Sequence, residues 1–141
     1  MTLVCRRDHR LAKKRRIKLA DLAGCELIHL APSTSVRQHV GLLTRGIGVK
    51  PSGLEVEHLA TLAGLIEHGL GVSLVPELTL FQFRNLNLVA IALEANDVMR
   101  PILIVRQKNR TLSIAAQGML ELIELRLRSV GTVRRDIPHG P

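Results

Sequence analysis

The alternation of apolar and polar residues predicts a β-α-β unit between residues 54 and 76. Leu54–Glu57 is short and suits a strand, and the apolar side chains at 59–66 recur at the three- and four-residue spacing of a helix. Gly69 follows the last of them and can adopt the left-handed conformation that ends a helix. Val72–Val75 is almost wholly apolar, which is typical of a strand covered on both faces.

The same patterns predict the elements on either side of this unit. Strands are expected at residues 2–7, 26–30, 88–93 and 102–106. Helices are expected at 17–24, 35–46, 77–84 and 113–129, and residues 131–141 are expected to be a disordered tail. The last helix carries an apolar stripe formed by Ala116, Met119, Leu120, Ile123 and Leu127. Strands that alternate with helices indicate an α/β fold with a mainly parallel sheet.

Composition narrows the class of protein. A chain of 141 residues, 46% of them apolar, is expected to form one compact domain. Phe81 and Phe83 are the only aromatic residues, so nucleic-acid binding through stacked bases has almost no basis. No apolar run reaches the roughly 18 residues of a membrane span and no secretion signal is recognisable, so we expect a cytoplasmic protein without a membrane partner. Cys5 and Cys25 lack redox or metal-binding spacing and are expected to be reduced and structural.

The net charge of +8 is concentrated at the start of the chain. Residues 1–18 hold eight Lys or Arg residues and a single acidic residue, Asp8, so this segment carries +7. The run Lys13–Arg16 could contact the phosphates of a nucleic acid, although a solvated loop is the commoner explanation of such a run. No helix-turn-helix, zinc-finger or RNA-binding signature accompanies it. A small basic nucleic-acid-binding protein is therefore an alternative that accounts for the charge alone.

The residue patterns of catalytic and metal sites are missing. Gly69-Leu-Gly71 follows a helix and precedes a strand, which is the reverse of a dinucleotide-binding turn. Glu67, His68 and Ser73 could supply an acid, a base and a nucleophile, but no GxSxG turn surrounds the serine. The six histidines form no HxxxH or HExxH pair. We therefore expect no enzymatic activity, no metal and no cofactor.

One constellation suggests a ligand. Ser33, Thr34 and Ser35 open the helix that follows strand 26–30. Free backbone amides and the positive end of the helix dipole attract a carboxylate, sulfate or phosphate, and ligands of open α/β sheets collect at the carboxyl ends of strands. Either this segment binds an anion, or one hydroxyl simply caps the helix.

Six segments, in order between residues 4 and about 126, resemble the second half of the effector-binding region of LysR-type transcriptional regulators. They are Cys5–Ala12, Leu19–Gly24, Pro32–Arg37, Gly46–Pro51, Leu65–Pro76 and Arg106–Ala116. The resemblance implies a type 2 periplasmic-binding-protein-like lobe together with an incomplete part of its partner lobe. A solute-binding protein of the transport class shares this fold and is a second alternative, but it would need an export signal.

The resemblance also implies a division of the chain. Residues 8–90 would form the second lobe, 2–7 and 88–93 would be the two strands that cross between lobes, and 102–129 would return to the first lobe. The winged helix-turn-helix, the linker helix and the front half of the first lobe, which family members carry, are missing from this chain. DNA would therefore be bound only through the absent N-terminal domain. The last helix would lack the strands that it covers, so we expect a homo-oligomer.

For the effector, the resemblance implies a small organic anion in the cleft between the lobes. The residues expected around it are Ser33, Thr34, Ser35, Val49, Lys50, Gly71, Val72 and Ser73. Lys50 would suit a carboxylate, whereas Gly71 and Val72 would serve equally well in a turn and in the core.

Overall fold

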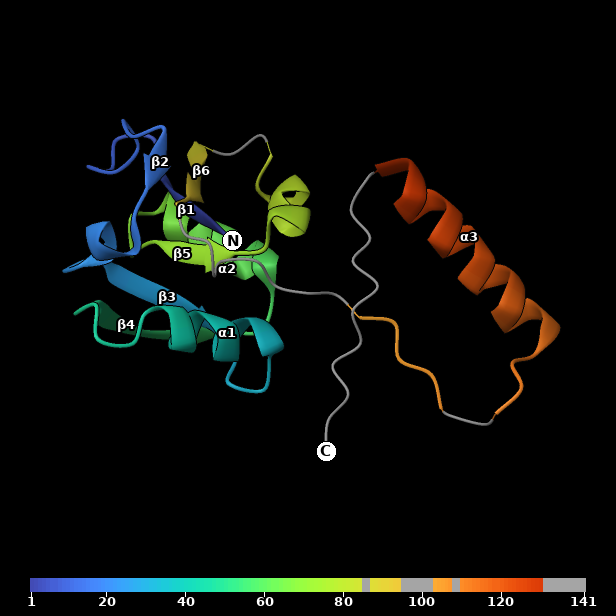
Figure 1. The fold of residues 1–141 in the computed structure, drawn as a ribbon. Helices are drawn as coiled ribbons and strands as arrows, with labels where there is room; N and C mark the ends of the chain where they lie inside the picture. Colours follow the sequence, from blue (N-terminus) through green and yellow to red (C-terminus); the bar gives the residue numbers. More distant parts are fainter. Residues whose placement is uncertain (85–86, 95–102, 108–109, 131–141) are drawn as a thin grey trace. The chain divides into compact units, whose positions relative to one another are not determined.

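The structure is a computed structural model that describes residues 1–84, 87–94, 103–107 and 110–130. Its internal contacts divide the chain into two compact units, Met1–Ile102 and Leu103–Pro141 (Figure 1). The first unit contains every strand among the described residues, and the second contains one helix. The predicted disordered tail, 131–141, lies outside the described residues.

The first unit is built on six strands. These are β1 Thr2–Arg6, β2 Arg16–Ile17, β3 Glu26–Leu30, β4 Lys50–Val56, β5 Ser73–Val75 and β6 Leu88–Leu93. Four of them form one sheet in the order β2-β6-β1-β5, and β3 pairs with β4. A parallel bridge between Leu27 and Val72 joins the two sets, so the strands follow one another in the order β4-β3-β5-β1-β6-β2.

Strand directions are mixed. β3 runs parallel to β4, and β2 runs parallel to β6. β1 runs antiparallel to both of its neighbours, β5 and β6. The predicted α/β class with a mainly parallel sheet is confirmed, since β1 is the one strand among the described residues that runs against the others.

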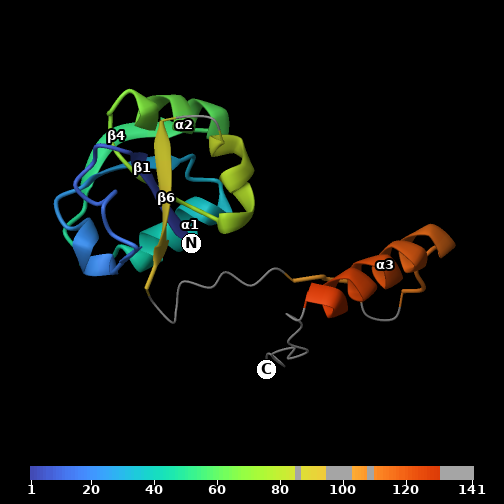
Figure 2. The same ribbon diagram turned by 90° about the horizontal axis from the view of Figure 1, so that it is seen from above.

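Helices cover both faces of the strands. The helical segments of the first unit are the 3-10 helix η1 Leu19–Leu22, α1 Ser35–Leu43, α2 Leu59–Glu67 and the 3-10 helix η2 Glu77–Phe83. Seen from above, α1 and α2 lie on opposite sides of the strands (Figure 2). Each face therefore has its own apolar core.

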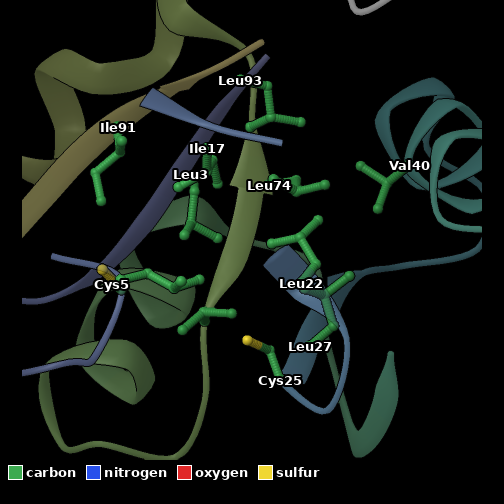
Figure 3. Packing of buried hydrophobic residues seen from close by; sticks show 12 residues of the cluster. Leu3, Cys5, Ile17, Leu22, Cys25, Leu27, Val40, Leu74, Ile91 and Leu93 are labelled. Carbon is green, nitrogen blue, oxygen red and sulfur yellow. The ribbon is translucent and has the colours of Figure 1, made fainter. Parts of the chain in front are cut away.

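Successive side chains of a strand point to opposite faces, so they enter different cores. Leu3 and Cys5 of β1 point to the core under α1, whereas Val4 points to the core under α2. The α1 side gathers Leu27, Leu74 and Val40 (Figure 3). The α2 side gathers Ile28, Val75, Leu62, Ala63 and Ile66. This period of two is the one that an extended chain imposes on its side chains.

The central β-α-β prediction is confirmed, including the end of its helix. Gly69 has φ +80°, and its amide bonds the carbonyl of Ile66 at 2.9 Å. Such a left-handed residue satisfies a carbonyl that the helix leaves open. The strand before α2 begins at Lys50, earlier than predicted, because Lys50 and Pro51 already pair with Glu26 and Leu27 of β3.

Three other elements differ from the prediction. The segment 17–24 forms no continuous helix, because Ile17 pairs with Leu93 in the sheet and only Leu19–Leu22 turns into a 3-10 helix. The helix after Pro76 is also 3-10 rather than α. Residues 103–106 form no strand, and the side chains of Leu103 and Val105 are 67% and 86% exposed. Residue 102 lies outside the described residues.

The second unit contains α3, Ile114–Val130. The predicted Ser113 cap is confirmed, since the hydroxyl of Ser113 accepts the amide hydrogen of Ala116 at 3.2 Å. Within α3, Glu124 and Arg128 lie one turn apart with Oε2 and Nη2 separated by 3.7 Å.

Candidate functional site

The N-terminus of α1 is held by Thr34. Its Oγ1 accepts the amide hydrogen of Arg37 at 3.2 Å and donates to the carbonyl of Ala31 at 2.8 Å. The threonine hydroxyl is therefore occupied by the backbone, as in the capping alternative. Ser33 and Ser35 are exposed at the same terminus, and the first turn of the helix contains no acidic residue. The terminus keeps the positive potential of its amides.

A cationic side chain reinforces this potential. Arg37 lies in the first turn of α1, and its Nη2 is 3.8 Å from Oε1 of Glu55 on β4, a long contact for an ion pair. The Nε of Arg37 is buried and has no hydrogen-bond partner among the described residues. The guanidinium therefore has donor capacity that the described protein groups leave unused.

His29 lies beside this pair. It stands opposite Glu55 in the β3–β4 register. Burial lowers the pKa of His29 below its ordinary value, and Arg37 lowers it further, against an opposing effect of Glu55. The imidazole is therefore neutral at pH 7, and the local charge is set by Arg37 and Glu55.

The remaining predicted effector residues lie elsewhere on the strands. Lys50 begins β4, pairs with Glu26 at the start of β3, and donates its amide hydrogen to the carbonyl of Cys25 at 2.9 Å. Val49, just before it, packs against the core under α1. Because β3 rises about 3.3 Å per residue, Lys50 is separated from the α1 terminus by roughly 13 Å along the sheet.

Gly71, Val72 and Ser73 belong to the same distant group. A Cβ at Gly71 would lie 2.7 Å from the carbonyl oxygen of Glu26, so only glycine fits this close approach. Val72 is buried in the core, and the buried hydroxyl of Ser73 donates to the carbonyl of Ile28 at 2.9 Å. The structure thus brings Ser33, Thr34 and Ser35 together, and it places the other five residues towards the amino ends of β3, β4 and β5.

The structure adds residues that the sequence did not single out. Arg37, His29 and Glu55 meet under the start of α1. The segment after β4 reaches the same edge, because the amide of Ala31 bonds the carbonyl of Val56 at 2.9 Å. Neighbouring parallel strands bring their carboxyl ends to one edge, and this rule applied to β3 and β4 would have indicated Glu55.

The catalytic trio considered from the sequence does not assemble. Glu67 accepts the amide hydrogen of Asn87 through Oε1 at 3.0 Å, and Nδ1 of His68 lies 2.8 Å from the carbonyl oxygen of Gly64. The hydroxyl of Ser73 is committed to Ile28. Each side chain is therefore engaged by a different part of the backbone.

Metal and thiol chemistry can be judged from the same contacts. Within the described ranges, no three His, Cys, Asp or Glu side chains gather in the way that a metal ion needs. Both cysteines are free and buried. Burial raises the pKa of Cys5 to about 11, with smaller contributions from Cys25 and Asp8, so its thiol is protonated and unreactive at neutral pH. None of the helices in the part of the chain that the structure describes could span a bilayer.

Comparison with known proteins identifies a family and individual regulators that this chain resembles over most of its length. The family profile described as "LysR substrate binding domain" matches residues 1–128. The uncharacterized HTH-type transcriptional regulator YbhD of Escherichia coli K12 is 35% identical over 125 residues, which cover 86% of this chain and 38% of that protein. The transcriptional dual regulator GltC of Bacillus subtilis is 31% identical over 118 residues, covering 82% and 39%. The chain thus spans less than half the length of these curated relatives.

Solved structures share the fold. The regulatory domain of CcmR from Synechocystis PCC6803, in complex with 2-PG, has a TM-score of 0.77 and 22% identity over 89% of this chain and 61% of that one. The effector-binding domain of QuiR, in complex with shikimate, has a TM-score of 0.68 and 22% identity over 94% and 62%. Their fold is of the kind predicted from the sequence, a type 2 periplasmic-binding-protein-like arrangement.

Proposed function

We propose that this chain, which belongs to the family of LysR substrate-binding domains, is the ligand-sensing part of a transcriptional regulator. In this proposal a small organic anion binds at the carboxyl ends of β3 and β4, against the first turn of α1. DNA would be bound through an N-terminal domain of a longer regulator, which would act in the cytoplasm as a homo-oligomer. The division into a second lobe at 8–90 and a returning part of the first lobe at 102–129 belongs to the same proposal.

The observation that carries the proposal is the polarity of the α1 terminus. Ser33 and Ser35 are exposed there, acidic residues are missing from the first turn, and Arg37 has a buried Nε without a partner among the described residues. A carboxylate at this terminus would gain backbone amides, hydroxyl groups and a guanidinium, and hydrogen bonds to charged groups are the stronger kind. The two neighbours described above were solved with bound small molecules, 2-PG and shikimate.

The five other predicted effector residues remain a separate prediction. Lys50 would add a second cation to an anion site only if the ligand reached the amino end of β4. Ser73 would contribute only if its hydroxyl left the carbonyl of Ile28. The proposal therefore assigns the first contact to Ser33, Thr34 and Ser35 with Arg37, and leaves Val49, Lys50, Gly71, Val72 and Ser73 to experiment.

A titration of the isotopically labelled chain with a panel of small carboxylates tests the site. Chemical-shift changes are expected at residues 31–37 and 55–58. Arg37→Gln should weaken binding by roughly ten- to a hundredfold, because a charged hydrogen bond contributes about 1.5 to 3 kcal/mol. Lys50→Ala and Ser73→Ala are the matched controls and should leave the affinity unchanged within about twofold.

Two results would contradict this assignment. Shifts confined to residues 49–50 and 71–73, with Lys50→Ala as the damaging variant, would move the anion to the other end of the strands. Shifts confined to the tail after residue 131 would remove the site from the folded unit altogether.

A further inference from the structure

We propose that the basic loop, defined as residues 6–18 from the end of β1 through β2, is a second interaction surface that binds the phosphate backbone of duplex DNA without reading its sequence. This inference rests on the proposed function, since a DNA-bound regulator would hold its sensing domain near the duplex. It concerns a different surface from the anion site and goes beyond binding through an N-terminal domain.

Most cations of the basic loop keep their charge unneutralised. The loop holds eight Lys or Arg residues. Arg6 pairs with Asp8 through its Nε at 2.9 Å from Oδ1, and Lys14 pairs with Asp21 at 2.7 Å. Those are the carboxylate pairs made by the loop among the described residues. The other cations are Arg7, Arg10, Lys13, Arg15, Arg16 and Lys18.

The basic loop is ordered by its own contacts. Leu11 and Ile17 are buried in the core under α1 and anchor the loop at two points. Amides at Ala12 and Lys14 close turns onto the carbonyls of His9 and Leu11, at 2.9 and 3.0 Å. A charged surface held in a fixed shape loses less conformational entropy on binding than a flexible tail.

Hydrogen bonds from Arg10 fix the loop to η1 and to the residue that follows it. Nη2 of Arg10 donates to the carbonyls of Asp21 at 3.1 Å and Ala23 at 3.0 Å, and lies 3.0 Å from Sγ of Cys25. These partners are uncharged, so Arg10 contributes to the electrostatic potential of the loop while it positions the backbone.

The span of the loop suits a nucleic-acid groove. β6 lies between β1 and β2, and β2 is the edge strand of this sheet, with Arg6 opposite Leu88 and Arg16 opposite Ala92. From the spacing between strands and the rise along them, the ends of the loop are roughly 16 Å apart. This length is of the same order as the width of the major groove, about 12 Å.

The composition of the loop favours a duplex backbone over other polyanions. The loop contains no aromatic residue on which an unpaired base could stack. Leu11 and Ile17 are buried, so neither can insert into a lipid surface, and stable attachment to a membrane combines apolar contact with charge. Arginine, which matches phosphate geometry well, supplies four of the six unneutralised cations.

The test measures the salt dependence of binding by the full chain to a labelled duplex of random sequence, by fluorescence anisotropy. The loop variant combines Lys13→Ser, Arg15→Ser, Arg16→Ser and Lys18→Ser, and it keeps Arg6, Arg10 and Lys14, whose side chains make the ion pairs and hydrogen bonds described above. The control variant combines Arg45→Ser, Arg84→Ser, Arg106→Ser and Arg110→Ser, which are exposed residues outside the loop. Both variants lose the same net charge.

We expect the wild-type chain to bind with a steep salt slope. Each phosphate contact contributes about 0.9 to the slope of log K against log salt, so the loop variant should lose about 3 to 4 slope units and at least tenfold in affinity at 50 mM salt. The control variant should keep the slope within about one unit. Equal losses in both variants would overturn the proposal, since net charge alone would then be responsible, and so would the absence of wild-type binding at low salt.

Further titrations distinguish duplex DNA from other polyanionic partners, and the basic loop from the carboxylate site. Vesicles containing anionic lipid and a polyglutamate chain are titrated in parallel, and a loop-dependent affinity for either that exceeds the affinity for the duplex would overturn DNA as the partner. The carboxylate titration is repeated on the loop variant. If the loop variant still binds carboxylates but no longer binds the duplex, the two surfaces are independent. If the wild-type chain fails to bind carboxylates, the proposed function is contradicted, whereas the duplex-binding proposal is still decided by the salt slope.

Discussion

Gly71 shows how one missing side chain sets the distance between two strands. Its φ of +150° and the 2.7 Å that would separate a Cβ from the carbonyl oxygen of Glu26 let β5 approach β3 closely. The amide of Val72 then bonds the same carbonyl at 2.9 Å. The contact joins the two sets of strands, so this position is tied to the integrity of the sheet.

Gly71→Ala should destabilise the fold by about 2 to 3 kcal/mol, because the methyl group forces either backbone strain or separation of the strands. Gly64→Ala is the matched control, since Gly64 lies within α2 and an added Cβ meets no atom within 4 Å. That change should stabilise by about 0.5 to 1 kcal/mol. Urea unfolding measures both, and equal effects of the two substitutions would disprove the role given to Gly71.

His29 makes stability depend on pH below neutrality. Its pKa in the folded state is lowered from 6.5, first by burial and then by Arg37. The unfolded chain therefore takes up the proton at a higher pH than the folded chain, and stability falls as the pH drops below about 6.5. His29→Gln should remove part of this decline between pH 7 and 5, measured as unfolding midpoints in urea. His9, whose pKa is also lowered, should account for a further part, and an unchanged decline in His29→Gln would refute the assignment.

At the same scale, the sequence indicated the residues at the start of α1 for a clear reason. Ser33–Ser35 were found because hydroxyl residues before a helical pattern mark a helix start. Lys50 was expected in a loop because Pro51 and Gly53 are typical loop residues, yet both lie within β4, where Gly53 has φ +73° and the register with β3 shifts. Because β4 begins at Lys50 rather than at Leu54, Lys50 lies at the end of the strand that is remote from the α1 terminus. Arg37 was missed because one cation on a helix has no pattern of its own.

At the scale of elements, local pattern was sufficient where an element buries one face against its sequence neighbours. The α2 stripe is of this kind, and the apolar run of β5, which is buried throughout, was equally recognisable. The local pattern was insufficient where pairing with a residue far away in the sequence determines the secondary structure. Ile17 has the apolar spacing of a helix, but pairing with Leu93 makes it a two-residue strand. Residues 103–106 are apolar enough for a strand, but the described residues offer them no pairing partner.

The helix α3 carries more apolar surface than the sequence analysis recognised. Besides the predicted stripe, a second stripe runs through Ile114, Leu122 and Leu125, and the side chains of Leu122 and Leu125 are 64% and 68% exposed. Gln117, Glu121, Glu124 and Arg128 line the polar side. A helix that is apolar around most of its circumference is generally buried in its working state.

For the molecule as a whole, these exposed stripes predict self-association. Each large aliphatic side chain that becomes fully buried contributes about 1.5 to 3 kcal/mol before the costs of association are deducted. We expect oligomers at micromolar concentration by sedimentation equilibrium, and Ile123→Glu with Leu127→Glu should shift them towards monomers. A strictly monomeric chain with residues 113–129 still helical would show that these stripes need no second copy.

The antiparallel pairing of β1 with β6 has a consequence for how the first unit can be attached to other polypeptides. Thr2 stands opposite Ala92, and the amide of Leu93 lies 3.5 Å from the carbonyl oxygen of Met1. The start of β1 and the end of β6 therefore lie one strand spacing apart, about 5 Å. A folded unit whose two outer strand ends lie side by side can be inserted into a surface loop of another protein with little strain.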